Sequence, residues 1–393
     1  MNFNLNDEQQ LLQDSVRRFT DKAYAFETRC ALVKAGGGGS EQNWRTFADN
    51  GWLAAALPEE YGGLGGTVLD TALITQQFGR ALVIEPYLGS AVLAAQTFVA
   101  AAGPALLDTL LPALADGSKR ISLAYSEPSS RGDPAIVCAT AMQVADGYRI
   151  QGRKTLVLGA GDADWFIVSA RVQDTVGVDE GISLFLVPAR STGLSPQSLP
   201  LHDGTYAAEL TFEQTEVPAN ALLGARGAGL PALRHGLSHG MTALCAELVG
   251  AMERAIELTA EYLKVRKQFG VPIASFQALQ HRMADMAAEL ELSRSMLYAM
   301  LASLEGEPGA GQQQALSQGK AFIGRAAKWV CAQAIQLHGG IGMTDEYAIG
   351  HYFKRAVVAD VLFGTSDQHE AANAAALQQT LREEHAPVRT ACV

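Results

Sequence analysis

The sequence has little of several features that mark common classes of protein. Only 7% of its 393 residues are aromatic, and its 30 Lys and Arg are outnumbered by 41 Asp and Glu. The resulting net charge of −11 disfavours a phosphate backbone, so we expect no nucleic-acid partner. The five cysteines lie far apart and form no Cys-x-x-Cys pair, which argues against a disulfide framework or a metal site and favours a cytoplasmic protein.

Long hydrophobic runs are also absent. The most apolar stretch, 91–107, is interrupted by Gln96, Thr97, Gly103 and Pro104, and it falls short of the roughly 20 apolar residues that span a membrane. The polar start, MNFNLNDEQQ, does not resemble a signal peptide, so we expect no membrane association. Neither a G-x-G-x-x-G pattern nor a P-loop is present.

What is present predicts three domains. Residues 1–120 show helical spacing of apolar residues, residues 121–230 hold short β-branched and aromatic runs separated by Gly, Asp and Pro, and residues 231–393 are helical again. Long helices are expected at 241–264, 276–304 and from 315. We therefore predict a mainly α protein with an N-terminal helical domain, a middle antiparallel β-sheet or barrel domain, and a C-terminal four-helix bundle.

Residues 236–240 match the G-x-S-x-G pattern of serine hydrolases. In such enzymes the serine, here Ser238, sits on a turn between a strand and a helix, and Asp360 and His369 follow in a suitable order. No convincing strand precedes the pattern, so a helix entry is the competing interpretation. His235 and His239, four residues apart, suit a metal ion but lack a third ligand nearby.

Longer patterns are more specific. They are LPEEYGGLGG (57–66), SEP (126–128), RKQFGVPIASFQALQHR (266–282) and QLHGGIGMTDEY (336–347). With these segments and its order of domains, the whole chain resembles the acyl-CoA dehydrogenase family. Together with YAFE (24–27), the last two segments look most like those of the small subunit of pimeloyl-CoA dehydrogenase.

The resemblance implies FAD, bound between subunits, with its adenosine and pyrophosphate end on the neighbour's C-terminal domain. That end of the cofactor can be bound by a positive charge, a flat apolar side chain, side-chain amides and exposed glycine backbone. The residues implied there are Arg266, Phe269, Gln277, Gln336, Gly339, Gly340 and Gly342. Ser126 is implied at the flavin ring, and Thr365 is a further implied contact of the cofactor.

The resemblance also implies α,β-desaturation of an acyl-CoA to a trans-2-enoyl-CoA, which needs a carboxylate to remove the α proton. The two positions at which relatives carry that Glu are Phe363 and Gly240 here. Glu247, two helical turns after Gly240 and about 10 Å along the axis, is therefore the candidate base. The alternative is a surface Glu247 paired with Arg254 or a partner.

The middle domain departs from the family pattern as well. A family serine is replaced by Gly132, and a Trp and a Thr beside the flavin are replaced by Leu156 and Leu158. Two interpretations stay open, a catalytic chain that uses Glu247 and a subunit that completes a partner's FAD site.

The resemblance further implies an electron-transfer flavoprotein as acceptor and a homo- or hetero-tetramer. A dicarboxyl, branched or cyclic acyl group is allowed, and Arg131 or Arg234 is a candidate contact for a distal carboxylate.

Overall fold

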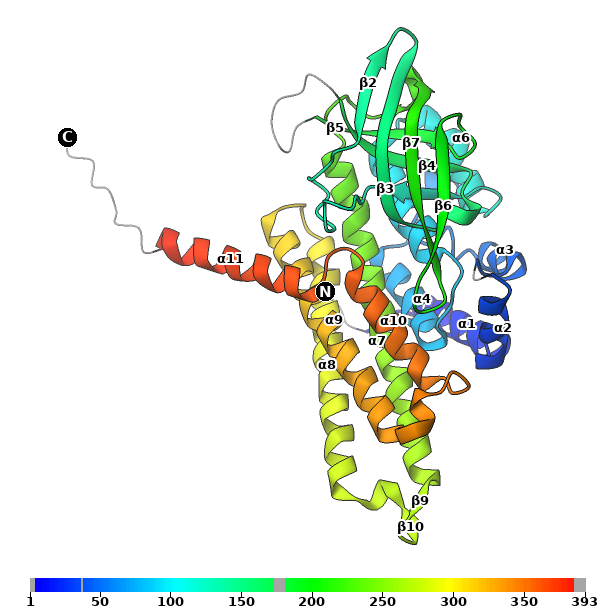
Figure 1. The fold of residues 1–393 in the computed structure, drawn as a ribbon, viewed down its shortest axis with the longest axis vertical. Helices are drawn as coiled ribbons and strands as arrows, with labels where there is room; N and C mark the ends of the chain where they lie inside the picture. The colour runs from blue at the N-terminus through cyan, green and yellow to red at the C-terminus, as the bar shows by residue number, and fades with distance from the viewer. Residues whose placement is uncertain (1–3, 37, 173–180, 385–393) are drawn as a thin grey trace, which may run out of the picture.

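The computed structural model describes residues 4–36, 38–172 and 181–384. Figure 1 shows a β domain at one end and a long helical bundle that runs away from it, with the N-terminal helices packed beside both. The N-terminal helices are α1 (Asp7–Ala23), α2 (Phe26–Lys34), α3 (Glu41–Asp49), α4 (Val68–Ala81), the π-helical η2 (Tyr87–Ala94), α5 (Ala95–Ala101) and α6 (Pro104–Ala115), with a short η1 (Glu59–Tyr61).

Helix α1 begins where the sequence places a cap. The Asn6 side chain accepts from the Gln9 backbone N–H at 2.8 Å, and the Gln9 side chain accepts from the Asn6 N–H at 3.1 Å. This reciprocal capping box satisfies two donors that a helix start would leave open. The aromatic residues of this region then form one cluster around Phe47, which stacks on Phe78 with ring centroids 4.8 Å apart.

The middle domain is a single sheet with strand order β6-β7-β3-β2-β4-β5-β8, and β1 pairs with β4. Its strands are β1 (Ile121–Ala124), β2 (Thr140–Val144), β3 (Gly147–Leu158), β4 (Trp165–Val172), β5 (Ile182–Pro188), β6 (Leu194–Pro200), β7 (Tyr206–Pro218) and β8 (Leu222–Leu223), with η3 (Ala160–Asp162) and η4 (Ala219–Ala221) between them. The pairing is antiparallel as predicted, except that β4 runs parallel to β1 and to β2.

The C-terminal bundle consists of α7 (Leu230–Val265), α8 (Gln277–Leu304), α9 (Ala310–His338) and α10 (Ile349–Val361). A hairpin of β9 (Lys267–Gln268) and β10 (Val271–Pro272) and a turn, η5 (Ile273–Ser275), join α7 to α8, and η6 (Gly339–Met343) joins α9 to α10. The last helix, α11 (Ser366–Glu384), extends away from the body in Figure 1. The predicted order of helical, β and helical regions is confirmed.

Helix α7 starts eleven residues before the predicted position 241, because its glycines serve packing rather than a loop. A Cβ at Gly236 would lie 1.9 Å from Thr97 Oγ1, and one at Gly250 would lie 1.9 Å from the Gln76 carbonyl oxygen. Glycine thus lets α4 and α5 approach the backbone of α7 closely. From the sequence alone, such glycines indicate a break in the helix.

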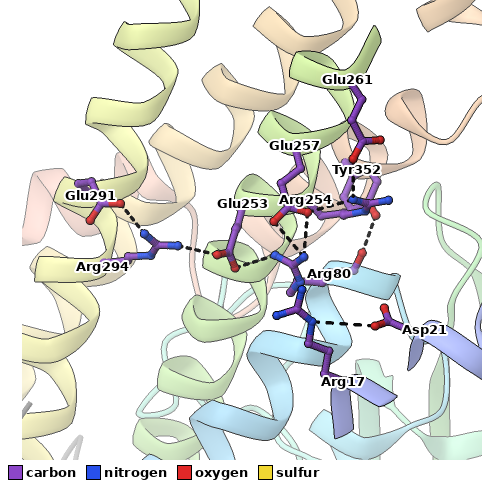
Figure 2. Close-up of polar contacts among 10 residues, drawn as sticks. All are labelled: Arg17, Asp21, Arg80, Glu253, Arg254, Glu257, Glu261, Glu291, Arg294 and Tyr352. Carbon is purple, nitrogen blue, oxygen red and sulfur yellow. Dashed lines mark hydrogen bonds and ion pairs between the residues drawn. The ribbon is translucent and has the colours of Figure 1, made fainter. Parts of the chain in front are cut away.

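Arg80, at the end of α4, ties the N-terminal domain to the bundle (Figure 2). Its guanidinium pairs with Glu253 at 2.9 Å and with Glu257 at 2.8 Å, both on α7. Arg294 of α8 reaches the other side of Glu253 at 2.7 Å. Tyr352 of α10 donates to the Arg80 carbonyl, so one residue links three helices of the bundle to the N-terminal domain.

Two further observations concern the sequence-based expectations. No helix in the described part of the chain is long and apolar enough to cross a membrane. The thiols of Cys30, Cys138, Cys245 and Cys331 are free, and Cys392 lies outside the described residues.

Candidate functional site

A cavity of about 410 Å³ lies where the three regions meet, and we call it the interdomain cavity. The β1–β2 connection contributes Tyr125 to Pro128 and Arg131, β3 contributes its last residues, η2 contributes Leu93, and the α10–α11 turn contributes Phe363 and Thr365. Ser126, predicted for the flavin ring, and Thr365, predicted as a cofactor contact, therefore line the same cavity.

An ion pair is buried beneath this cavity. Lys154 of β3 is fully buried and donates to Glu127 at 2.7 Å and to Ser169 Oγ at 2.9 Å. Burial alone would raise the pKa of Glu127, but Lys154 and the N–H groups of Cys138 and Ala139 outweigh burial and lower this pKa. Burial lowers the pKa of Lys154 to about 8, although Glu127 opposes that shift. The Glu127 carboxylate is therefore fully engaged and holds the β1–β2 connection in place.

The wall formed by β3 is apolar where the family carries hydrogen-bonding groups. Leu156 has a φ of 52°, and the register of β3 against β7 shifts between Lys154 and Val157, so a bulge turns this stretch toward the cavity. Leu156 and Leu158 both line the cavity. Their side chains offer no donor or acceptor. Apart from the hydroxyl of Thr155, which also lines the cavity, any hydrogen bond to a flavin from this wall must come from backbone groups.

The turn between α10 and α11 is held by four different side chains. His369 Nε2 donates to the Phe363 carbonyl at 2.9 Å, and Lys320 donates to the Gly364 carbonyl at 3.0 Å. Gln368 accepts from the Thr365 N–H at 2.8 Å, and Asp360 accepts from the Ser366 N–H at 3.1 Å. The turn that would carry the base in relatives is thus rigid, although no base is on it.

The ring of Phe363 occupies the space that the missing carboxylates would need. Phe363 has a φ of 61° and is buried, and its Cζ lies 3.3 Å from the position of a Cβ on Gly240. The two alternative family positions of the base therefore face one another. Neither carries a group that accepts a proton.

Glu247 is paired, but not with Arg254. Arg355 of α10 donates to both Glu247 oxygens, at 2.6 and 2.9 Å, whereas Arg254 binds Glu257 and Glu261 (Figure 2). The Nη1 atom of Arg355 forms an ion pair with Asp203 at 2.9 Å. Glu247 does not line the interdomain cavity, but lines a smaller one beside it. Glu247 is also buried rather than on the surface, and the Arg355 guanidinium occupies both of its oxygens.

The other predicted FAD contacts gather at the far tip of the bundle. Phe269 is 92% exposed with a φ of 52°, and no other atom lies within 4 Å of a Cβ placed on Gly339 or Gly340. Arg266, Gln277 and Gln336 are exposed as well. Such an open aromatic face beside a cation and bare backbone fits the adenosine and pyrophosphate part of a cofactor.

The tip and the cavity of one chain cannot hold the same cofactor. Gly240 and Arg266 are both on or at the end of α7, and 26 residues separate them. At a rise of about 1.5 Å per residue this is about 39 Å, longer than an extended dinucleotide. One cofactor bound by a single chain therefore cannot reach both places.

The hydrolase interpretation is wrong. Ser238 lies inside α7 rather than on a strand-to-helix turn, and its hydroxyl donates to the Arg234 carbonyl at 2.8 Å. His369 binds Ser317 and the Phe363 carbonyl instead of a serine nucleophile.

The two histidines before Gly240 stack on each other. The rings of His235 and His239 have centroids 4.5 Å apart, and burial lowers the pKa of His239 to about 4. In the described residues no group of three or more His, Cys, Asp or Glu side chains is arranged to hold a metal ion.

Comparisons with known proteins define the class. Family models described as the N-terminal, middle and C-terminal domains of acyl-CoA dehydrogenase match residues 6–118, 122–215 and 227–378. A probable acyl-CoA dehydrogenase, YngJ of Bacillus subtilis, is 31% identical over 372 residues, which cover 93% of this chain and 97% of that protein.

Solved structures agree with the family models. Butyryl-CoA dehydrogenase of Megasphaera elsdenii is 26% identical, with a TM-score of 0.87 and coverage of 96% of this chain and 100% of that one. A variant of the Tcur3481-Tcur3483 steroid ACAD is 30% identical, with a TM-score of 0.86 and coverage of 95% and 99%. The chain belongs to the acyl-CoA dehydrogenase family. It is therefore an FAD-dependent flavoprotein oxidoreductase of acyl-CoA substrates, as the sequence predicted.

The sequence did not reveal the two ion pairs that border the cavities. Arg355 and Asp203 had no distinguishing pattern around them. Lys154 did carry a signal, since a lysine inside a strand of apolar and β-branched residues must find a buried anion if its face turns inward.

Proposed function

We propose that this chain is one subunit of a heteromeric acyl-CoA dehydrogenase. Its bundle tip completes the FAD site of a partner subunit, and its own interdomain cavity does not supply the base of the reaction. The observation that carries this proposal is the Phe363 ring packed against Gly240, because it fills both family positions of the carboxylate. The base for the α proton then comes from a chain of a different kind.

The reaction cannot proceed in this cavity without a base for the α proton. The thioester acidifies the α carbon, but a carboxylate within hydrogen-bond reach must still take the proton. FAD, when bound, accepts the β hydrogen as hydride. Glu127 is the acidic residue among those that line the interdomain cavity, and Lys154 and two backbone N–H groups already hold its oxygens. The cavity can bind and orient an acyl-CoA without activating it.

The proposal includes the finer resemblance to the small subunit of pimeloyl-CoA dehydrogenase, an enzyme that pairs a large and a small subunit. It is supported by the segments 24–27, 266–282 and 336–347, and by the similarity to the Tcur3481-Tcur3483 steroid ACAD, which is named after two proteins. We infer a hetero-tetramer in the cytoplasm with an electron-transfer flavoprotein as electron acceptor. The exposed Phe269 and Arg266 supply the contacts to the partner's FAD.

A flavin count tests the proposal. The chain is purified alone and together with its genomic neighbours of the same family, and the visible flavin absorbance is measured per chain along with the oligomeric mass. We expect little FAD on the isolated chain and a full complement in a mixed assembly. A homo-oligomer with one tightly bound FAD per chain and steady acyl-CoA turnover would overturn it.

A second candidate, catalysis by this chain through Glu247, has one observation in its favour. Glu247 lines a cavity that shares Leu158 and Leu362 with the interdomain cavity, so its carboxylate is near the substrate region. Release of Glu247 from Arg355 would be required before it could act. Glu247→Gln that abolishes turnover, with FAD content and assembly unchanged, would support this candidate, whereas retained turnover would exclude it.

A further inference from the structure

Two further hollows lie in sequence beyond the interdomain cavity, and the outer one is a groove on the surface. The first step is an inner cavity of about 100 Å³, which adjoins the interdomain cavity at Leu158 and Leu362. On the outer side lies a surface groove of about 620 Å³, lined by Arg29, Asp203 and His351 among others. The inner cavity and the groove share no lining residue, so something separates them.

The separating wall is an ion bridge. Glu247 and Arg355 line the inner cavity, and Asp203 lines the groove. Arg355 joins the two sides, since it donates to Glu247 at 2.6 Å and to Asp203 at 2.9 Å. Arg29 braces the outer side, since it donates to the Asp203 carbonyl at 2.7 Å. The partition is therefore about one side chain thick.

The inner cavity is apolar along its sides and negative in balance. Phe78, Ile84 and Leu88 line its sides. Its lining carboxylates are Glu85, Asp162 and Glu247, against Arg355 as cation. Asp162 also pairs with Arg120 at 3.3 Å. Neutral donors hold Glu85, namely the Tyr24 hydroxyl, the Ser40 N–H and the Asn43 amide.

The two exits of the interdomain cavity differ in kind. On its other side a wide cavity of about 740 Å³ carries Arg131, Arg234 and Gln368 and opens toward α11. Cations and amides suit the phosphates and the polar arm of a coenzyme. The small inner cavity suits the acyl end. Arg131 and Arg234 thus lie on the coenzyme side, away from a distal acyl carboxylate.

We propose that the Glu247–Arg355–Asp203 bridge is the end wall of the acyl site, and that it selects short acyl groups without a terminal charge. The inference rests on the proposed function for the arrangement of subunits, and it sets aside the dicarboxyl acyl group that the resemblance allowed. A volume of about 100 Å³ is smaller than the roughly 150 Å³ of an apolar cavity that holds one benzene, so only a few non-hydrogen atoms fit before the wall. A terminal carboxylate placed there would face the carboxylates of Glu85 and Glu247 in a poorly solvated space.

Binding of acyl-CoA thioesters to the purified assembly tests this without any need for turnover. We measure calorimetric affinities for heptanoyl-CoA and pimeloyl-CoA, which have equal chain lengths but differ by the terminal carboxylate. We expect pimeloyl-CoA to bind at least about tenfold more weakly, a step that one extra unfavourable charge contact readily causes. Equal or tighter binding of pimeloyl-CoA would overturn the proposal.

Two variants test whether the bridge causes the discrimination against a terminal carboxylate and the limit on acyl length. Glu247→Gln removes one negative charge while Arg355 keeps Asp203, so the discrimination should shrink several-fold, whereas Glu216→Gln, exposed on β7, should leave it unchanged. An unchanged ratio in Glu247→Gln would refute the role of the bridge.

The second variant tests the length limit. The charge-balanced triple variant Asp203→Asn, Glu247→Ala, Arg355→Ala removes the wall. It should bind dodecanoyl-CoA about tenfold more tightly than the wild type, as a path opens for apolar chain into the groove. Its circular dichroism and thermal midpoint check that it folds. If the triple variant does not fold, the ratio of the heptanoyl-CoA and pimeloyl-CoA affinities of Glu247→Gln decides alone. The flavin count of the proposed function is independent of both results.

Discussion

The ring of Phe363 lies 3.3 Å from the point at which a side chain on Gly240 would begin. One residue is on the α10–α11 turn and the other on α7, and 123 residues of sequence separate them. Their contact means that the ring and the missing side chain compete for one space. A carboxylate at position 363 would replace the ring, whereas one on Gly240 would meet both the ring and Leu93, whose Cδ1 lies 3.0 Å from the same point.

Phe363→Glu is expected to give the interdomain cavity a base. The backbone of residue 363 is already left-handed with Phe, and the same strain applies to Glu, so the change adds no new backbone cost. A positioned general base contributes about 10²-fold or more to rate. Acyl-CoA-dependent bleaching of flavin absorbance in the reconstituted assembly measures the gain.

Phe363→Gln is the matched control, since it has the same shape as Glu but accepts no proton. Equal rates of bleaching for the two variants, at equal FAD content, would show that the cavity lacks more than a base. The leucines at 156 and 158 would then be the next groups to change.

The sequence yields specific predictions for this site where a local pattern carries the chemistry. The order of helical and β regions, the tip residues such as Arg266 and Phe269, and the empty base positions are all visible in short segments. The resemblance to a family adds the expectation that the bundle tip of one subunit and the cavity of another bind one FAD, which no single segment reveals.

The sequence does not predict what depends on contacts between distant elements. Asp203, Glu247 and Arg355 come from a turn before β7, from α7 and from α10, and each looks like an ordinary charged residue in its own segment. The start of α7 is missed for the same reason, because Gly236 is explained only by the approach of Thr97. Tertiary packing overrides local propensity at such positions.

Arg355→Met is expected to destabilise the protein strongly. The substitution leaves Glu247 and Asp203 buried without their cation, and removal of one partner from a buried ion pair costs about 3–5 kcal/mol. The urea midpoint of the purified chain measures the loss. Arg149→Met is the control, since this arginine pairs with the exposed Glu216, and we expect it to shift the midpoint little. A similar loss in both variants would contradict a special role for the bridge.

Acid should weaken the domain interface through Asp203. Burial would raise the pKa of Asp203, but Arg355 and Thr205 outweigh burial and hold it below the usual 3.8. Its stabilising effect is therefore present above the usual pKa and is lost as the pH falls through the lower folded-state pKa.

The stability gap between wild type and Asp203→Asn should accordingly narrow as the pH falls below about 4. Thermal midpoints over a pH series measure the gap. A gap that stays constant to low pH would mean that Asp203 does not titrate in this way.

Phe269→Ala should lower the FAD content of the assembly while leaving the stability of the isolated chain almost unchanged. The side chain is 92% exposed in the chain by itself, so its loss should change the stability of the isolated chain by no more than about 0.5 kcal/mol. In the assembly the same ring is expected to cover a partner's FAD, and FAD content should fall. Leu11→Ala is the control, because Leu11 is also apolar and 65% exposed but lies on α1. If the two variants retain FAD equally, the exposed ring serves no cofactor and the tip binds something else.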